Sequence, residues 1–243
     1  MPSETSRRAF LTATGTAALA GACSALPAAE AAHGGARQTV KIVGIACSPR
    51  KGKTTASALA VCLEAAKAFD RRIEVELIEL AGLQIPGQVA AGLPLEPGQR
   101  DDFPPLVPKL SDPTVFGIIL GTPVYFGNMS YLCKALLDRS IIFHKAGGLA
   151  NKVGGVLAVG GGRNCGLELT VRSVQVSLMA QQMIVVGDAP PTGHWGGTVW
   201  AGNPAAGSPP DVTRDEPGIA TARNLGRRVA EVALRLAGPG SGR

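Results

Sequence analysis

Hydroxyl groups, positive charges and free backbone N–H groups are concentrated in one short loop of the chain. The loop reads Cys47-Ser48-Pro49-Arg50-Lys51-Gly52-Lys53-Thr54-Thr55 and lies between an apolar run and a helical pattern. N–H groups at the start of a helix attract anions, and hydroxyl and guanidinium groups add donors for phosphate oxygens. This loop is therefore predicted to bind a phosphate group.

A second loop, after a later apolar run, carries aromatic side chains. It reads Thr122-Pro123-Val124-Tyr125-Phe126-Gly127-Asn128-Met129-Ser130. An aromatic side chain beside flexible glycine backbone suits a flat ring. Because only 4% of the residues are aromatic, the adjacent Tyr125 and Phe126 favour a ring platform over core packing, which is the alternative. Together the two loops predict a phosphorylated aromatic cofactor.

Apolar runs typical of buried parallel strands alternate with helical patterns through the body of the chain. The predicted strands are residues 40–46, 73–80, 115–120, 153–159 and 183–186. The predicted helices are residues 54–70, 128–143 and 165–182, and a last helix whose start is marked by residues 213–217 and which ends at 237. Residues 81–113, with one short helix near 106–110, and residues 187–212 are predicted to be irregular.

This alternation predicts an α/β fold, a flavodoxin-like three-layer sandwich with a five-stranded parallel sheet in the order 2-1-3-4-5. Ligands of such sheets bind at the carboxyl ends of the strands. Three loops follow strands 1, 3 and 4, at residues 47–55, 121–130 and 160–166. In the helix after strand 3, the side chains expected to face the core are Leu132, Ala135, Leu136 and Ile142, with Asp138 and Arg139 on a solvated face.

Charge and residue spacing exclude several other kinds of site. The net charge is +6, but no long basic run or basic-aromatic stripe is present, so no nucleic-acid partner is expected. The five cysteines form no C-x-x-C pair and the three histidines have no ligand spacing, so no metal site is expected. Cys165 is expected to be a packing residue at a helix start.

The first residues have the pattern of an export signal. Arg7 and Arg8 precede Phe-Leu and a modestly apolar run, and small residues follow. The paired arginines resemble a twin-arginine signal, which exports folded proteins through its own export machinery. We expect an export signal and linker at residues 1–35, one domain at 36–237 and a loose tail at 238–243. The alternative is an ordinary amphipathic helix at the amino terminus.

Two processing sites follow the apolar run. Ala29-Glu30-Ala31 would release a soluble periplasmic or extracytoplasmic protein, which is the favoured outcome. Ala20-Gly21-Ala22-Cys23 resembles a weak lipoprotein box, which would leave a lipid anchor at Cys23.

Read together, the loops resemble those of the flavodoxin-like NAD(P)H-dependent FMN reductases, and among them the iron–sulfur flavoproteins and related quinone reductases. The motifs that carry the resemblance are Ser48-Pro49-Arg50-Lys51, the segment 122–128, Gly160-Gly161-Gly162-Arg163-Asn164 and Asp215-Glu216-Pro217-Gly218 with Ala222-Arg223-Asn224-Leu225-Gly226. The resemblance covers residues 40–237.

The resemblance implies which residues hold FMN. Those for the phosphate are Ser48, Arg50, Lys53, Thr54 and Thr55. Those for the ribityl chain and one ring edge are Pro123, Val124, Tyr125, Phe126, Gly127 and Asn128, and those for the pyrimidine side are Gly161, Gly162, Arg163 and Asn164. The resemblance also implies a homodimer or homotetramer.

One stretch departs from the iron–sulfur branch. That branch carries a compact cysteine cluster after the second strand, whereas residues 83–92 here contain no cysteine. Because such a cluster needs thiolate ligands, we predict no iron–sulfur cluster and FMN as the only redox centre.

The resulting hypothesis is an FMN-dependent oxidoreductase. It would pass electrons from a small-molecule donor, NADH or NADPH, to a quinone, a flavin or a similar small acceptor. One alternative is an exported FMN electron-transfer protein without turnover of its own. The other is a nucleotide hydrolase, because residues 47–54 read C-x-x-x-x-G-K-T and nearly fit the Walker pattern.

Overall fold

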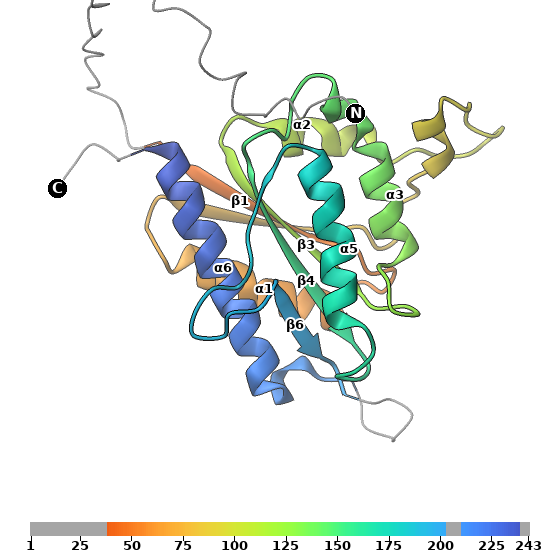
Figure 1. Cartoon of the computed structure of the whole chain (residues 1–243). Helices are drawn as coiled ribbons and strands as arrows, with labels where there is room; N and C mark the ends of the chain where they lie inside the picture. The colour runs from red at the N-terminus through yellow and green to blue at the C-terminus, as the bar shows by residue number, and fades with distance from the viewer. Residues whose placement is uncertain (1–37, 203–209, 239–243) are drawn as a thin grey trace, which may run out of the picture. The chain divides into compact units, whose positions relative to one another are not determined.

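The strands pair in parallel in the order β2-β1-β3-β4-β5 in the computed structural model, which describes residues 38–202 and 210–238 (Figure 1). The strands are β1 (Val40–Ala46), β2 (Ile73–Glu79), β3 (Val115–Pro123), β4 (Val153–Gly160), β5 (Ile184–Val185) and β6 (Gly197–Trp200). The helices are α1 (Thr54–Lys67), α2 (Val107–Ser111), α3 (Tyr131–Arg139), α4 (Ile141–His144), α5 (Leu167–Ala180) and α6 (Glu216–Ala237). Short 3-10 turns are η1 (Gly87–Ala91), η2 (Pro104–Leu106) and η4 (Val212–Arg214). This order confirms the predicted flavodoxin-like α/β fold.

The predicted export signal, with Arg7, Arg8 and Cys23, lies outside the described residues. Among the residues that are described, no helix is both long and apolar enough to cross a membrane.

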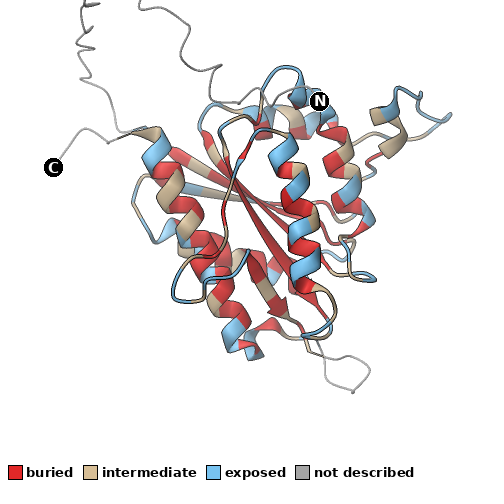
Figure 2. Cartoon of the chain, in the orientation of Figure 1, coloured by how far each residue is buried: buried red, intermediate tan, exposed pale blue. Residues whose placement is uncertain are grey.

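Strand side chains alternate between two core layers, as parallel strands covered on both faces require. Ile42 of β1 packs with α1 and α6 on one face, whereas Val43 and Ile45 pack with α3 and α5 on the other. Figure 2 shows buried residues along the sheet-facing sides of α5 and α6 and exposed residues on their outer sides. The two helix layers therefore hold the sheet rigidly, and the loops at its carboxyl edge are built on a fixed frame.

The position of the fifth strand is filled by two short segments. β5 pairs only with the start of β4, at Val153 and Gly154, and β6 pairs with its end, from Leu157 to Gly160. Between them the chain leaves the sheet through Gly187 and two prolines, which cannot donate to a strand ladder. The prediction that residues 187–212 are wholly irregular was therefore wrong, and β6 brings Trp200 beside Gly160 at the carboxyl edge.

The helix predicted over residues 128–143 is broken at Ser140. The Ser140 hydroxyl donates to the Leu136 carbonyl (2.8 Å), and the chain continues as the short helix α4. The break changes which side faces inward, so Phe143 is buried and Ile142 is 55% exposed. The prediction that Ile142 faces the core was wrong.

Arg139 is buried, contrary to the solvated face predicted for it. Its guanidinium binds both carboxylate oxygens of Asp101 (3.0 and 2.8 Å) and the Pro86 carbonyl (3.2 Å), and it lies over the Phe103 ring. Burial alone would raise the pKa of Asp101, but hydrogen bonds from Arg139 and from the Phe103 N–H outweigh it and lower that pKa. This pair ties the long connection after β2 to α3.

Candidate functional site

The three predicted loops lie at one edge of the sheet, because β1, β3 and β4 are parallel neighbours. The Ser130 hydroxyl joins the first two loops: it donates to the Cys47 carbonyl (2.5 Å) and accepts the Cys133 N–H (3.2 Å). The second and third loops touch at Gly166, where a Cβ would lie 2.8 Å from the Gly127 Cα. Only glycine allows this approach, so the three loops form one continuous surface.

The start of α1 has free anion-binding capacity. Its first residue is preceded by Lys53, which makes no side-chain capping hydrogen bond, and its first turn contains no acid. Beside these N–H groups, the hydroxyl-bearing residues Thr54 and Thr55 are buried. A helix start without a cap leaves N–H donors that a phosphate can satisfy. The residues present therefore fit the phosphate predicted for this loop.

The rest of the phosphate loop is held in shape by its own hydrogen bonds. The Arg50 N–H donates to the buried Ser48 hydroxyl (3.1 Å), and the Gly52 N–H donates to Glu79 Oε2 at the end of β2 (2.7 Å). A cavity of about 460 Å³ adjoins the loop, lined by Arg50, Gly52, Lys53, Thr54, Ser57 and residues 210–213. Asp211 is the one acid in this lining, and hydrogen bonds from Thr213 lower its pKa.

The second loop presents its aromatic residues to solvent. Tyr125 and Asn128 exchange backbone hydrogen bonds (2.9 and 3.0 Å), and the two residues between them have positive φ, +51° at Phe126 and +73° at Gly127. These angles describe a tight turn of type I′, which is unusual for an aromatic residue. Phe126 is fully exposed and Tyr125 is 42% exposed. The core-packing alternative for this pair is therefore excluded, and the pair is available to a ring.

Earlier in the same loop, the Val124 N–H donates to the Val159 carbonyl (2.9 Å) and so joins the loop to the end of β4. Pro123 is buried as the last residue of β3. These two predicted residues therefore anchor the loop to the sheet.

In the third loop, the Arg163 side chain binds other residues of the protein. Arg163 Nη2 binds Asp215 Oδ1 (2.6 Å), and its guanidinium lies over the Trp200 ring. The Trp200 indole N–H in turn donates to the Gly161 carbonyl (3.1 Å). Gly161 and Asn164 remain exposed and Gly162 is half-buried. Asp215 and Trp200 therefore hold the loop in place from its inner side, and Gly161 and Asn164 face solvent.

Two residues of this arrangement were missed as site residues by sequence reasoning. Asp215 is buried and accepts the N–H groups of Trp200 (2.6 Å) and Gly218 (3.2 Å) besides binding Arg163. The sequence marked Asp215 as a helix start, but its link to Arg163 spans 52 positions. Trp200 gave no signal, because its strand was not predicted.

The four cysteines in the described residues are not grouped as metal ligands. Cys47 and Cys133 are buried side by side beneath the first two loops, and the hydrogen bond between them, together with burial, raises the pKa of Cys47. Burial likewise raises the pKa of the Cys62 thiol. In the described part of the chain, no three His, Cys, Asp or Glu side chains are grouped to hold a metal ion.

Residues 40–196 match the family model described as NADPH-dependent FMN reductase. The chain belongs to this FMN reductase family. This FMN reductase family member is a flavin-dependent oxidoreductase.

Known proteins are similar to this chain over most of its length. An iron-sulfur flavoprotein from Methanocaldococcus jannaschii is 40% identical over 198 residues, which are 79% of this chain and 97% of the relative. An NAD(P)H dehydrogenase (quinone) from Chromohalobacter salexigens is 31% identical over 68% of this chain and 84% of the relative. A WrbA-like flavodoxin from Agrobacterium tumefaciens has the same fold, with a TM-score of 0.54 and 18% identity over 80% of this chain and 97% of that one.

Proposed function

We propose that this family member binds FMN across the three loops and passes electrons from NADH or NADPH to a quinone, a flavin or a similar acceptor. The observation that carries the proposal is the uncapped start of α1 beside Arg50, at the edge where Tyr125 and Phe126 are exposed. The relative named as a quinone dehydrogenase supports a quinone as acceptor. When bound, FMN supplies the hydride and electron chemistry.

The protein's own residues bind and orient. Ser48, Arg50, Lys53 and the hydroxyls of Thr54 and Thr55 would hold the phosphate with the N–H groups of α1. The turn from Tyr125 to Asn128 would cover the ring and exclude water, and Gly161, Gly162 and Asn164 would offer backbone and amide donors. The Arg163–Asp215 pair positions this third loop without needing to touch the ring.

A visible absorption spectrum followed by steady-state assay tests the proposal. Purified residues 36–243 should be yellow and release about one FMN per chain on heating, and NADH or NADPH should bleach the colour until a quinone is added. A yellow protein that neither nucleotide reduces would favour the electron-carrier alternative. A colourless protein that does not take up FMN would contradict the proposal and favour the nucleotide hydrolase.

We also propose that the flavin is the only redox centre. The support is the absence of cysteine from residues 83–92, although the M. jannaschii relative is named as an iron-sulfur flavoprotein. Measured iron in stoichiometric amount would contradict this.

We propose that the chain is exported by the twin-arginine route and functions outside the cytoplasm. The support is the pattern of Arg7, Arg8 and the apolar run. Replacing both arginines by lysine keeps the charge and should trap the protein in the cytoplasm. Cell fractionation measures where the protein is. Export of the variant at the wild-type level would contradict the twin-arginine route.

Assembly as a homodimer or homotetramer is a further part of the proposal. Leu169, Val176 and Met179 leave an exposed apolar stripe along α5, which supports contact with a second copy. Light scattering that gives a monomer mass would contradict it.

A further inference from the structure

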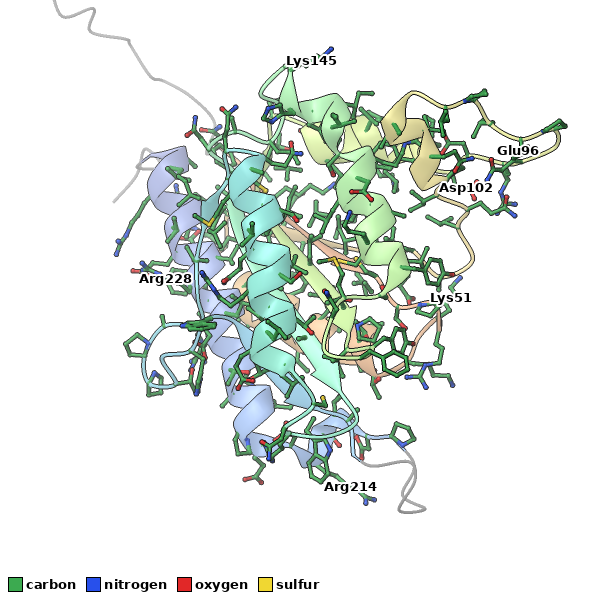
Figure 3. All side chains as sticks on the ribbon, turned by 45° about the vertical axis from the view of Figure 1, so that its right-hand side comes forward. Lys51, Glu96, Asp102, Lys145, Arg214 and Arg228 are labelled. Atoms are coloured by element: carbon green, nitrogen blue, oxygen red, sulfur yellow. The ribbon has the colours of Figure 1, made fainter. Side chains whose placement is uncertain are left out.

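A second cavity lies at the opposite end of α3 from the flavin loops. It measures about 450 Å³, opens to solvent, and is bordered by η1 in the connection after β2 and by the residues that follow α3. α3 starts at the second loop and ends at Arg139, which lines the cavity, so the two sites are separated by a helix of about 12 Å. Figure 3 shows Lys145 at the upper end of the molecule and Lys51 of the phosphate loop well below it.

The cavity is preformed. Arg139 is fixed by its two hydrogen bonds to Asp101, and Phe103, which is 1% exposed, is held beneath the Arg139 guanidinium. Small-molecule sites are typically preformed cavities of this size, with mostly apolar walls and a few polar groups that fix orientation.

The walls of the cavity expose apolar side chains that the core does not use. Ile141 and Ile142 line it and are 53% and 55% exposed, and Val89 and Ala90 of η1 face the same space. Removing such side chains from water on ligand binding is favourable, in proportion to the apolar area covered.

The cavity has one unbalanced charge. Lys145 lines it and forms no ion pair or hydrogen bond with any described residue, whereas the charge of Arg139 is balanced by Asp101. No carboxylate lines the cavity; the nearby Asp102 is paired with Arg100. A bound molecule would therefore meet an apolar surface and a single cation.

We propose that this cavity binds a small monocarboxylate with an apolar body. Its carboxylate pairs with the Lys145 ammonium, and its body covers Ile141, Ile142 and Val89. A neutral apolar molecule would leave the cation without a partner, and a dianion would bring one charge too many. The proposal does not depend on the flavin chemistry.

Calorimetric titration of the full domain with octanoate tests the proposal. Octanoate should bind saturably at one site per chain, and octanamide, which has the same body without the charge, should bind about fivefold more weakly. Lys145→Gln should weaken octanoate binding by a similar factor. Lys67→Gln removes the same charge from the exposed end of α1 and should leave binding unchanged.

The apolar wall is tested separately. Ile142→Gln should weaken binding of octanoate and octanamide alike, whereas Leu236→Gln, a similar change of an exposed aliphatic residue on α6, should not. Three results would overturn the proposal: no saturation by octanoate in the wild type, equal affinity of the Lys145 and Lys67 variants, or dissociation of an oligomer by Ile142→Gln. Binding to phosphatidylglycerol vesicles without binding of free octanoate would also overturn it, in favour of a lipid surface.

Discussion

Replacing Arg50 by alanine is expected to weaken FMN binding roughly ten- to a hundredfold. A hydrogen bond to a charged group contributes about 1.5–3 kcal/mol, and each 1.4 kcal/mol is a factor of about ten in the dissociation constant. Arg50 is exposed and forms no ion pair with a described residue, so its loss should not disturb the fold. Titration of the apoprotein with FMN, followed by quenching of flavin fluorescence, measures the change.

Two further variants make the result specific. Arg71→Ala removes the same charge before β2, away from the cavity beside the phosphate loop, and should bind FMN as the wild type does. Thr55→Val keeps the shape of a residue that is 1% exposed but removes its hydroxyl, and should weaken binding about fivefold. Raising the salt concentration should reduce the effect of Arg50→Ala more than the effect of Thr55→Val. The reason is that Arg50 carries a charge of its own and Thr55 does not. Unchanged affinity in Arg50→Ala would place the phosphate elsewhere.

The strands that set the sheet order could be predicted from the sequence because β1, β3 and β4 are nearly continuous apolar runs and β2 alternates apolar and acidic residues. β6 was not predicted because it has only four residues, of which Gly197 and Thr198 are not apolar. It forms only through pairing with β4, a contact that no local pattern records. Ile142 was assigned to the wrong side because the break at Ser140 depends on a hydroxyl that bonds back to its own helix.

The candidate site shows the same division between local and distant information. The phosphate loop and the aromatic turn are each one continuous stretch of sequence. The parallel pairing of β1 with β3 brings them to the same edge of the sheet. Arg163 was placed in the right loop, but its partner Asp215 is 52 positions away, and its stacking on Trp200 depends on β6. Arg139 was read as solvated because its partner Asp101 lies 38 positions earlier. Polar residues whose partners are distant were the ones that sequence reasoning misplaced.

Gly226→Ala is expected to destabilise the protein, although alanine is the better helix former. Gly226 lies on α6 where this helix crosses α1, and a Cβ there would overlap the Cys62 carbonyl oxygen and lie 2.9 Å from its carbonyl carbon. The obstacle is backbone, which cannot rotate away as a side chain can. Alanine favours a helix over glycine by about 1 kcal/mol, but overpacking costs about 1–3 kcal/mol or more. Because the overlap is with backbone, its cost is expected at about 3 kcal/mol, the upper end of this range, which leaves a net loss of about 2 kcal/mol.

Urea unfolding measures this loss as a lower midpoint with an unchanged slope. Gly87→Ala is the matched control, because a Cβ at Gly87 meets nothing within 4 Å, and its free energy of unfolding should stay within about 0.5 kcal/mol of the wild type. Since α1 carries the phosphate site at its start, separation of α1 from α6 should also weaken FMN binding in the folded variant. A stable Gly226→Ala protein with full FMN affinity would mean that the two helices can move apart without disturbing the site, and that their close approach does not position the phosphate loop.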